Sequence, residues 1–524
     1  MNNSVAQVSA VARRAAQARN WPQVRACAQE ILHRQNDSAE GHFLLGLAEK
    51  AAHRSLQAIE SFSAAIASDP GRYDAATELA EQHMHEHRYG DAADLLARHE
   101  SLMQNSPRYL NMAATIYVNI GLPARGWPLY RRANELQPGV DSIQANLAAC
   151  SVYVGKIDEA KAIYAGLLRK HPQHQRNHYE LSRLGRATNA AHVDEMKAVL
   201  QQTQLPPAQN IYLYYAIGKE LEDLERWNEA FEYYRMAGDA AASVANYDVQ
   251  TDLRLIDKVI EVCTADWLAH GVAESMSDSS GVVPVFIVGL PRSGTTLTER
   301  ILSSHAKVES AGESFFMQIM IKRESGIESD DSMNAAIIEA AGRADIHRIG
   351  AGYMQAIAYR LSDKYMFIEK FPENFLYLGF VAKAFPGARI VHLKRNPMDA
   401  CFAMFKQSFF RYAYSLDDLG LYYAAYRRLH EHWRKVLGTR LIELDYEDLV
   451  SDQEEKTRWL LDQIGLEFDS ACLNFEKNEA ASNTASTVQI REKVHTRSVQ
   501  RWKCFERQLQ PLRSFLEGAG IPVE

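Results

Sequence analysis

The stretch GLPRSGTT, residues 289–296, has residue types and spacing suited to binding a phosphate group. It follows the apolar, β-branched run VVPVFIVGL and precedes TLTERILSSH, whose apolar residues have helical spacing. A strand, a tight loop and a helix in this order present backbone amides and a helix N-terminus to an anion. Gly289 and Gly294 are spaced as in the phosphate loop of nucleoside triphosphatases, but Thr295 stands where that loop needs lysine. The loop therefore predicts anion binding without kinase or ATPase activity, and its cation is Arg292.

The run P-R-S-G-T-T-L resembles the 5′-phosphosulfate loop of the sulfotransferase superfamily. This resemblance implies that the chain binds 3′-phosphoadenosine-5′-phosphosulfate (PAPS) and moves its sulfuryl group to a hydroxyl. The implied ligands of the 5′-phosphate are the amides and hydroxyls of Ser293, Gly294, Thr295 and Thr296.

A second segment, AFPGARIVHLKRNPMDACFAMF, has a strand pattern followed by a helix pattern, and His392 inside that strand is expected in the core. Its R-N-P-x-D resembles the 3′-phosphate segment of the same superfamily and puts Arg395 on that phosphate, which arginine suits through its paired donors. Family members usually carry a serine eight residues later, where this chain has Ala403. Ser408 is too far along the helix to be an obvious replacement, so one hydroxyl contact is expected to be missing.

The resemblance to one branch, the tyrosylprotein sulfotransferases, extends over residues 281–524. The run H-A-K-V-E-S-A-G-E-S corresponds to H-P-D-V-x-C-G-E-E of that branch and puts Glu313 on its catalytic base. The run E-K-F-P-E-N-F corresponds to N-K-D-P-F and puts Lys370 on its catalytic lysine. His305 also matches a histidine of the family; we interpret it as structural, and it is the alternative base. Weaker correspondences imply nucleotide contacts by Tyr446, Ser486 and Arg501.

Sulfuryl transfer resembles phosphoryl transfer, in which an acceptor oxygen attacks in line and a phosphate oxygen leaves. The catalyst must take a proton from the acceptor, stabilise the transferred group and neutralise the leaving group. Here Glu313 is the expected base, and Arg292 and Lys370 are the expected cations, with Lys370 near the bridging oxygen. No metal is expected, because the sulfuryl group carries less charge than a terminal phosphate. The aromatic-rich residues 409–430 are most simply helix packing, with lining of the acceptor cleft as the alternative.

The elements before residue 240 repeat every 34 residues, with small residues at Gly46, Ala80, Ala114 and Ala148. A second small residue follows each after 12 positions, and a bulky one four positions later: Phe62, Leu96, Tyr130 and Tyr164. Prolines at three equivalent positions, Pro70, Pro138 and Pro172, would end the second helix of each unit. This pattern resembles the tetratricopeptide repeat, whose two helices cross at small residues. With weaker units at residues 5–35 and 178–205 and a further unit from Gly218, we expect about six.

The predicted architecture is an all-α tetratricopeptide solenoid at residues 1–240, a helical linker at 241–280 and a P-loop-like, parallel-sheet α/β sulfotransferase domain at 281–524. Such repeats usually hold a peptide or protein, which favours recruitment of a hydroxyl-bearing peptide or protein acceptor. A scaffold or a dimerisation element is the alternative, and a homodimer stays open. The acceptor hydroxyl could belong to tyrosine, another phenol or a carbohydrate.

The net charge of −8 and the pI of about 6.2 disfavour nucleic acid as the main partner. The sequence has no apolar run near the roughly 20 residues that cross a bilayer and no secretory signal, so a cytoplasmic protein is predicted. The six cysteines lack metal or disulfide spacing, which favours reduced, mostly buried thiols.

Two other functions compete with the enzyme. The first is a repeat scaffold whose C-terminal domain binds a nucleotide without catalysing, which the replacement at Ala403 and the divergent tail would allow. The presence of Arg292, Glu313 and Lys370 argues against this alternative. The second is a kinase or another triphosphatase, which would need the missing P-loop lysine.

Overall fold

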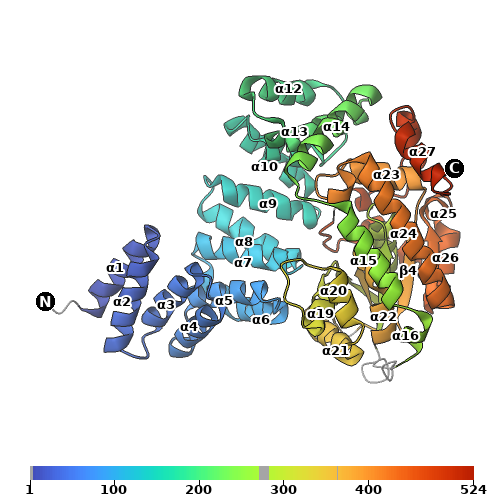
Figure 1. Cartoon of the computed structure of the whole chain (residues 1–524). Coiled ribbons are helices and arrows are strands. Elements are labelled where there is room, and N and C mark those ends of the chain that lie inside the picture. Colours follow the sequence, from blue (N-terminus) through green and yellow to red (C-terminus); the bar gives the residue numbers. More distant parts are fainter. Residues whose placement is uncertain (1–3, 271–281, 363, 485) are drawn as a thin grey trace. The chain divides into compact units, whose positions relative to one another are not determined.

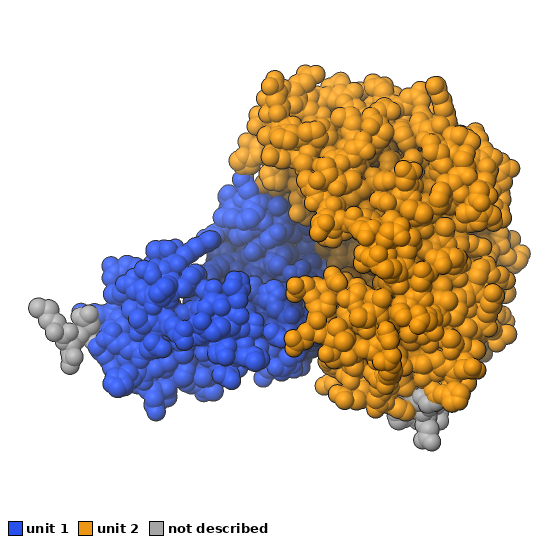
Figure 2. All heavy atoms as spheres, in the orientation of Figure 1, with its two compact units in different colours: residues 1–150 blue, residues 151–524 orange. Residues whose placement is uncertain are grey.

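The computed structural model describes residues 4–270, 282–362, 364–484 and 486–524 (Figure 1). The described chain forms two compact units, residues 1–150 and 151–524 (Figure 2). Helices alone make up the first unit, and the second combines helices with a five-stranded sheet. This mixture of an all-α part and a parallel α/β part confirms the predicted fold class.

Seven consecutive helix pairs occupy the described residues 5–244. The first four are α1 (Val5–Gln17) with α2 (Trp21–Arg34), α3 (Ala39–Ala51) with α4 (Ser55–Ser68), α5 (Tyr73–His85) with α6 (Tyr89–His99), and α7 (Pro107–Asn119) with α8 (Pro123–Leu136). The other three are α9 (Asp141–Tyr153) with α10 (Ile157–Lys170), α11 (Gln175–Ser182) with α12 (Ala191–Thr203), and α13 (Ile211–Asp223) with α14 (Trp227–Val244). This is one pair more than the expected number of about six, and both weakly matching units form helices.

Small residues lie at the crossings of the repeat helices, as the sequence pattern predicts. A Cβ atom added at Gly46 would lie 2.5 Å from the ring of Phe62, and one at Gly218 would lie 2.8 Å from that of Tyr234. Both rings are buried, with exposed fractions of 0% and 2%. The bulky residue of each unit therefore fills the space that the small residue leaves free.

The predicted helix-ending prolines also lie where the repeat pattern places them. Helices α4, α8 and α10 end at residues 68, 136 and 170, two positions before Pro70, Pro138 and Pro172. Proline disfavours the helical conformation of the residue before it, so the chain turns at these points.

The sheet contains β1 (Val283–Gly289), β2 (Val308–Gly312), β3 (Met366–Lys370), β4 (Arg389–Lys394) and β5 (Leu441–Asp445). Its strand order is β2-β3-β1-β4-β5, and all neighbouring strands are parallel. The central strand β1 places Ile287 beside Lys370 of β3 and beside Val391 of β4. His392 of β4 is fully buried, as predicted. The chain crosses from one side of β1 to the other between β3 and β4, which is where open α/β sheets bind ligands.

The helices that accompany the sheet are α18 (Thr295–Ser303), α19 (Phe316–Ser325), α20 (Ala335–Ala341), α21 (Ile346–Ile357), α22 (Leu378–Ala384), α23 (Pro397–Phe405), α24 (Leu416–Leu437), α25 (Tyr446–Ser451), α26 (Gln453–Ile464) and α27 (Gln510–Gly518). Short 3₁₀ turns are η1 (Glu100–Met103), η2 (Pro207–Gln209), η3 (Ala358–Arg360), η4 (Pro372–Tyr377), η5 (Arg411–Ala413), η6 (Gly438–Arg440), η7 (Ser470–Lys477), η8 (Gln489–Arg491) and η9 (Arg501–Phe505). On one face of the sheet, Val285 and Ile287 pack with α18 and α26. On the other face, Phe286 packs against Tyr353 and Phe385.

The predicted linker contains two helices, α15 (Val249–Val262) and α16 (Ala265–Ala269). Helix α15 lies beside α24 (Figure 1) and also contacts α20, so this segment is part of the second unit. The predicted polar linker at residues 273–281 lies outside the described residues.

The last repeat helix, α14, packs against helix α23, which accompanies the sheet. The ring of Phe231 stacks on that of Phe405, with centroids 5.9 Å apart, and Tyr234 meets Phe402 edge to face at 6.3 Å. These contacts join α14 to α23, so the second compact unit begins at residue 151 rather than after the repeats. The predicted domain boundaries at residues 240 and 280 mark where the residue pattern of the sequence changes. They remain a prediction.

Four of the six cysteines, Cys150, Cys263, Cys401 and Cys472, are buried, as predicted for most of them. Within the described ranges, no helix has both the length and the apolar character needed to cross a bilayer.

Candidate active site

Each of the five strands ends at or just before a predicted site residue. Lys370 is the last residue of β3, whereas Glu313, Arg395 and Tyr446 directly follow β2, β4 and β5. Arg292 lies in the loop after β1. Because the strands are parallel, all five residues lie at the same edge of the sheet.

The loop after β1 has the backbone shape that its glycines allow. Gly289 has φ +142°, and a Cβ atom there would lie 2.4 Å from the carbonyl oxygen of Leu393. Gly294 has φ +98°, and its Cβ would lie 2.5 Å from Cδ2 of Tyr446. Arg292 has φ +68° although it is not glycine, a conformation that costs roughly 1–2 kcal/mol. Helix α18 begins directly after this loop at Thr295, which confirms the predicted strand, loop and helix.

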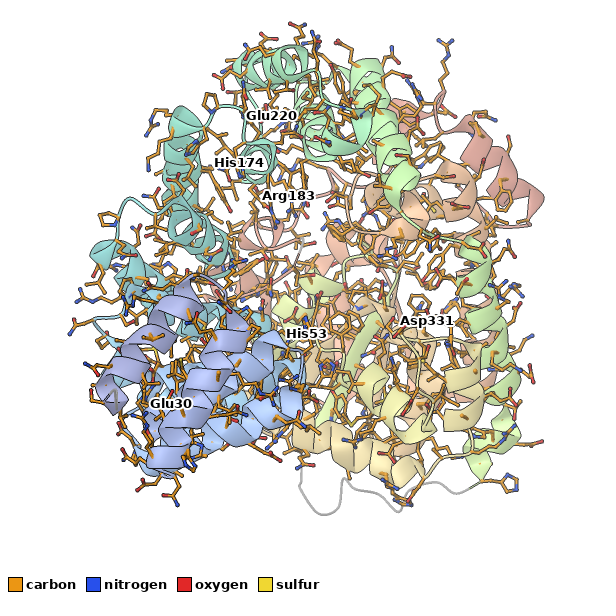
Figure 3. The ribbon with its side chains drawn as sticks, turned by 60° about the vertical axis from the view of Figure 1, so that its left-hand side comes forward. Glu30, His53, His174, Arg183, Glu220 and Asp331 are labelled. Carbon is orange, nitrogen blue, oxygen red and sulfur yellow. The ribbon has the colours of Figure 1, made fainter. Side chains whose placement is uncertain are left out.

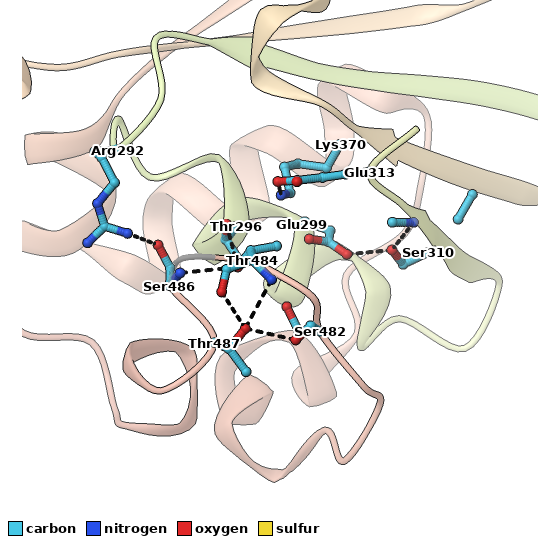
Figure 4. Close-up of polar contacts among 12 residues, drawn as sticks. Arg292, Thr296, Glu299, Ser310, Glu313, Lys370, Ser482, Thr484, Ser486 and Thr487 are labelled. Atoms are coloured by element: carbon cyan, nitrogen blue, oxygen red, sulfur yellow. Dashed lines mark hydrogen bonds and ion pairs between the residues drawn. The ribbon is translucent and has the colours of Figure 1, made fainter. Parts of the chain in front are cut away.

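The guanidinium of Arg292 contacts only neutral side chains among its described partners. It donates hydrogen bonds to Oγ of Ser486 and, at 2.9 Å, to Oε1 of Gln489 (Figure 4). Burial and the nearby charges of Arg395 and Arg183 lower the pKa of Arg292 to about 10. A half-buried cation with neutral partners is stabilised by an anion beside it.

Arg395 is held against the same loop. Its Nη1 donates to the carbonyl oxygen of Arg292 at 2.7 Å, and its Nη2 donates to that of Ser498 at 2.7 Å. The guanidinium carbon lies 4.8 Å from the ring centroid of Tyr446. In the described chain, Nε of Arg292, Nε of Arg395 and Oγ of Ser293 are buried without a hydrogen-bond partner. These atoms can still bind oxygen atoms of a ligand.

Glu313 and Lys370 form an ion pair at the carboxyl edge (Figure 4). The lysine side chain is fully buried, whereas the glutamate side chain is 34% exposed. Arg360 donates hydrogen bonds to the carbonyl oxygens of Ala311 and Glu313, at 2.7 and 2.8 Å, and so fixes the backbone after β2. The pair thus places a carboxylate at the surface of the site and a cation directly behind it.

Two neighbouring carboxyl groups bind protons more tightly than usual. Glu369 is fully buried and accepts hydrogen bonds from the hydroxyls of Ser314 and Tyr353, and burial raises its pKa to about 7. The pKa of Glu373 is raised to about 7 by burial and by the charges of Asp252 and Glu313. Glu369 is part of the packed interior, whereas Glu373 lines the pocket described next.

A pocket of about 500 Å³ opens at this edge of the sheet. The predicted residues that line it are Arg292, Gly294, Thr295, Thr296, Glu313, Arg395, Tyr446 and Ser486. Five phenylalanines, Phe475, Phe315, Phe371, Phe409 and Phe410, make part of the wall aromatic. The last two belong to the aromatic-rich stretch, so part of that stretch lines the cleft and the rest packs in α24.

Several pocket residues were not predicted. They are Tyr153, Arg183, Glu373, Asn483, Thr484, Gln489, Lys493, His495 and Ser498. Gln489 lies in the S-T-V-Q motif, which was a usable signal, whereas Tyr153 and Arg183 lie in the repeat region and had none. Hydrogen bonds of Thr487 to the carbonyl oxygens of Ser482 and Thr484, at 2.8 and 2.6 Å, shape the segment that carries Ser486 (Figure 4).

The structure does not bring Arg501 to the lining of this pocket. Its Nε lies 3.2 Å from a carboxylate oxygen of Glu222, and its guanidinium lies over the ring of Trp227 at 4.4 Å. Asp399, the acid of R-N-P-x-D, explains this orientation, because it accepts hydrogen bonds from the amides of Gln500 and Trp502. These bonds fix the backbone on both sides of Arg501, whose nucleotide contact stays a prediction.

Other predicted residues also lie off the pocket lining. Ser293 is buried in the loop, and Lys370 is buried behind Glu313. His305 hydrogen-bonds to the carbonyl oxygen of Glu467 at 3.1 Å, as expected of a structural residue. Ser408 hydrogen-bonds to the hydroxyl of Tyr179 at 3.2 Å and does not line the pocket.

Residues 284–470, which include all five strands except the first residue of β1, match the model of the sulfotransferase family. The chain carries a sulfotransferase-family domain. In the described parts of the chain, no group of three or more histidine, cysteine, aspartate or glutamate side chains is placed to hold a metal ion.

Sequence relatives of the sulfotransferase domain cover different shares of the chain. An uncharacterized protein of Aquifex aeolicus is 28% identical over 428 residues, which are 79% of this chain and 55% of the relative. This chain therefore spans about half the length of that relative. A putative protein-tyrosine sulfotransferase of Caenorhabditis briggsae is 23% identical over 256 residues, 45% of this chain and 88% of the relative.

One similar solved structure is the sulfotransferase domain of the Synechococcus PCC 7002 olefin synthase, with 18% identity and a TM-score of 0.33. The similarity covers 42% of this chain and 87% of that domain.

Proposed function

We propose that this chain is a sulfotransferase that uses PAPS as donor and transfers the sulfuryl group to an acceptor hydroxyl. The observation that carries the proposal is the pair Arg292 and Arg395, half-buried at one loop, with buried and unpartnered Nε atoms, in a pocket that the carboxylate of Glu313 also lines. Two guanidiniums suit the phosphates of a nucleotide, and a carboxylate in the same pocket suits removal of a proton.

The donor's phosphates would be held by two groups of residues. The loop amides and hydroxyls of Ser293, Gly294, Thr295 and Thr296, at the N-terminus of α18, would bind the 5′-phosphate with Arg292. Arg395 would bind the 3′-phosphate, and Tyr446 and Ser486 would complete the nucleotide site. The unpartnered atoms of Arg292, Ser293 and Arg395 fit this assignment, because each would gain an oxygen acceptor or donor from the ligand.

When bound, PAPS supplies the sulfuryl group. Glu313, exposed to the pocket, would accept the proton of the acceptor hydroxyl. Lys370 holds the Glu313 carboxylate by its ion pair and would place a positive charge beside the oxygen that leaves. Arg292 would stabilise the charge on the transferred group.

The aromatic wall favours a flat acceptor. Phe315, Phe371, Phe409 and Phe410 line the pocket together with Glu313, which suits a phenol such as a tyrosine side chain. The Caenorhabditis briggsae relative, named a putative protein-tyrosine sulfotransferase, supports the same class of acceptor. We propose that the repeats recruit the peptide or protein that bears this hydroxyl, with a carbohydrate hydroxyl as the alternative.

The test is calorimetric binding of 3′-phosphoadenosine-5′-phosphate (PAP), the expected product, with ATP as the control. Micromolar or tighter binding of PAP that excludes ATP is expected. Well-folded protein that does not bind PAP would overturn the proposal. Binding of PAP without transfer from labelled PAPS to tyrosine-containing peptides or glycans would support the inactive scaffold instead.

A further inference from the structure

The repeat helices of the second unit contribute directly to the pocket. Tyr153 at the end of α9 and Arg183, the residue that follows α11, both line it. Figure 3 shows Arg183 in this repeat segment of the chain. The family model matches residues 284–470, so neither of these two residues belongs to the matched part.

Hydrogen bonds hold this repeat segment in place against the sulfotransferase domain. The amide of Ser482 donates to the carbonyl oxygen of Tyr153 at 2.9 Å. The hydroxyl of Tyr179 lies 3.2 Å from that of Ser408. The guanidinium of Arg183 lies over the ring of the same Tyr179, 5.1 Å from its centroid. Arg183 is therefore positioned by α11 and is not a freely moving surface side chain.

Positive charge gathers in the pocket around Arg183. Its charge contributes to the lowered pKa of Arg292, after burial and Arg395. The carboxylate that pairs with Arg183 is Glu180, at 3.7 Å, and Glu180 also lies 3.7 Å from Arg176. The guanidiniums of Arg183, Arg292 and Arg395 line one pocket, so a polyvalent anion bound there would stabilise all three.

We propose that Arg183 binds a phosphate group of the nucleotide, so that a repeat helix supplies the third arginine of the nucleotide site. The inference rests on the proposed function and deepens it. An anionic acceptor could offer the same oxyanion chemistry, and the experiment separates it from the nucleotide. The repeats then have a part in donor binding in addition to the proposed recruitment of an acceptor.

Arg186 provides a matched control. It lies three residues from Arg183 on the same segment, is exposed, does not line the pocket and pairs with Glu225 at 3.6 Å. Replacing Arg183 or Arg186 by alanine removes the same charge from the chain, but only Arg183→Ala removes it from the pocket.

Calorimetry of the full chain with PAP tests the inference. Arg183→Ala should weaken PAP binding about 10-fold or more, as expected for loss of a charge-assisted hydrogen bond. Arg186→Ala should bind as the wild type does, and Arg183→Lys should restore part of the affinity. Thermal melting of each variant shows whether it is folded.

Adenosine 5′-monophosphate, which lacks the 3′-phosphate, assigns the contact. If Arg183→Ala loses affinity only for PAP, Arg183 binds the 3′-phosphate. This is the phosphate for which Ala403 lacks the hydroxyl usual in the family. If Arg183→Ala loses affinity equally for PAP and adenosine 5′-monophosphate, Arg183 binds the 5′-phosphate. Either result supports the inference.

Unchanged PAP affinity in Arg183→Ala, with or without a raised KM for the acceptor, would overturn the inference and leave the proposed function standing. An equal loss in Arg186→Ala would also overturn it. A wild-type chain that binds no PAP would overturn the proposed function and this inference with it.

Discussion

At the scale of single residues, the proposed catalysis depends on the ion pair of Glu313 and Lys370. The lysine side chain is fully buried and ion-paired with the glutamate, whose side chain is 34% exposed. An arrangement of this kind keeps the carboxylate accessible while the lysine fixes its direction. Both residues are therefore expected to affect turnover more than nucleotide affinity.

Replacing Glu313 by glutamine should lower turnover by about 10²–10⁴-fold, because the amide cannot accept the proton of the acceptor. PAP affinity should hardly change, since the glutamine side chain has the same size and can still accept a hydrogen bond from Lys370. Steady-state kinetics and calorimetry measure the two quantities. Glu309→Gln, on β2 four residues before Glu313 and bonded to Ser362, is the control that should keep normal turnover. Normal turnover in Glu313→Gln would show that another residue is the base.

The buried carboxyl of Glu369 makes stability depend on pH. Its pKa is about 7 in the folded chain, against about 4.3 in an unfolded one, so the folded state binds the proton more tightly. Its stabilising contribution is complete below the unfolded pKa and is lost as pH rises through the folded pKa. The free energy of unfolding should therefore fall between about pH 4.3 and 7, by roughly 1.4 kcal/mol per pH unit for this group.

The variant Glu369→Gln should flatten that dependence, because the amide stays neutral and can still bond to Ser314 and Tyr353. Urea unfolding of wild type and variant at several pH values from 5 to 8 measures the slopes. An unchanged slope in the variant would mean that Glu369 does not titrate in this window.

At the scale of elements, the loop between β1 and α18 is defined by its backbone. Gly294 is needed for two separate reasons, its φ of +98° and the 2.5 Å approach of its Cβ position to Tyr446. Gly326, at the end of α19, has φ +66° but nothing within 4 Å of its Cβ position. Alanine substitutions at the two positions therefore distinguish the cost of the backbone conformation from the cost of the steric contact.

We expect Gly326→Ala to lose about 1 kcal/mol of stability from φ alone. Gly294→Ala should lose more, and it should also bind PAP more weakly because the loop must move away from Tyr446. Denaturant unfolding and PAP calorimetry of both variants measure these effects. Wild-type PAP affinity in Gly294→Ala would contradict the proposed role of the loop.

Helices and strands that are marked by a pattern within their own residues could be predicted from the sequence. The 34-residue period located the repeat helices, and the apolar run before GLPRSGTT located β1 and α18. Contacts between distant segments could not be predicted, because they depend on how elements pack. The burial of Lys370 behind Glu313 and the orientation of Arg501, which follows from the hydrogen bonds of Asp399, are of this kind.

At the scale of the whole molecule, repeats and sheet are not independent within the second unit. Glu222 of α13 forms an ion pair with Lys406 at 2.9 Å and contacts Arg501 at 3.2 Å. A Cβ atom at Gly238 of α14 would lie 2.4 Å from the carbonyl oxygen of Tyr414. The repeat pattern gave no sign of this close packing, because it continues past residue 150, through a weaker unit at residues 178–205.

A fragment of residues 151–524 should therefore fold cooperatively and bind PAP like the full chain. A fragment of residues 281–524 should melt at a lower temperature and bind PAP more weakly. It lacks Phe231 and Tyr234, which cover Phe402 and Phe405, and burial of each such ring contributes roughly 1.5–3 kcal/mol. Thermal melts and calorimetry compare the two. Full PAP affinity in the shorter fragment would mean that the repeats add nothing to the site.

The hydrogen bond between Arg292 and Ser486 joins residues that are 194 positions apart. At ribosomal rates of about 5–20 residues per second, the loop is made roughly 10–40 s before its partner. During that interval the growing chain has β1 and its loop but lacks one wall of the pocket. The site can therefore form only late in synthesis, after the repeats and most of the sheet have had time to fold.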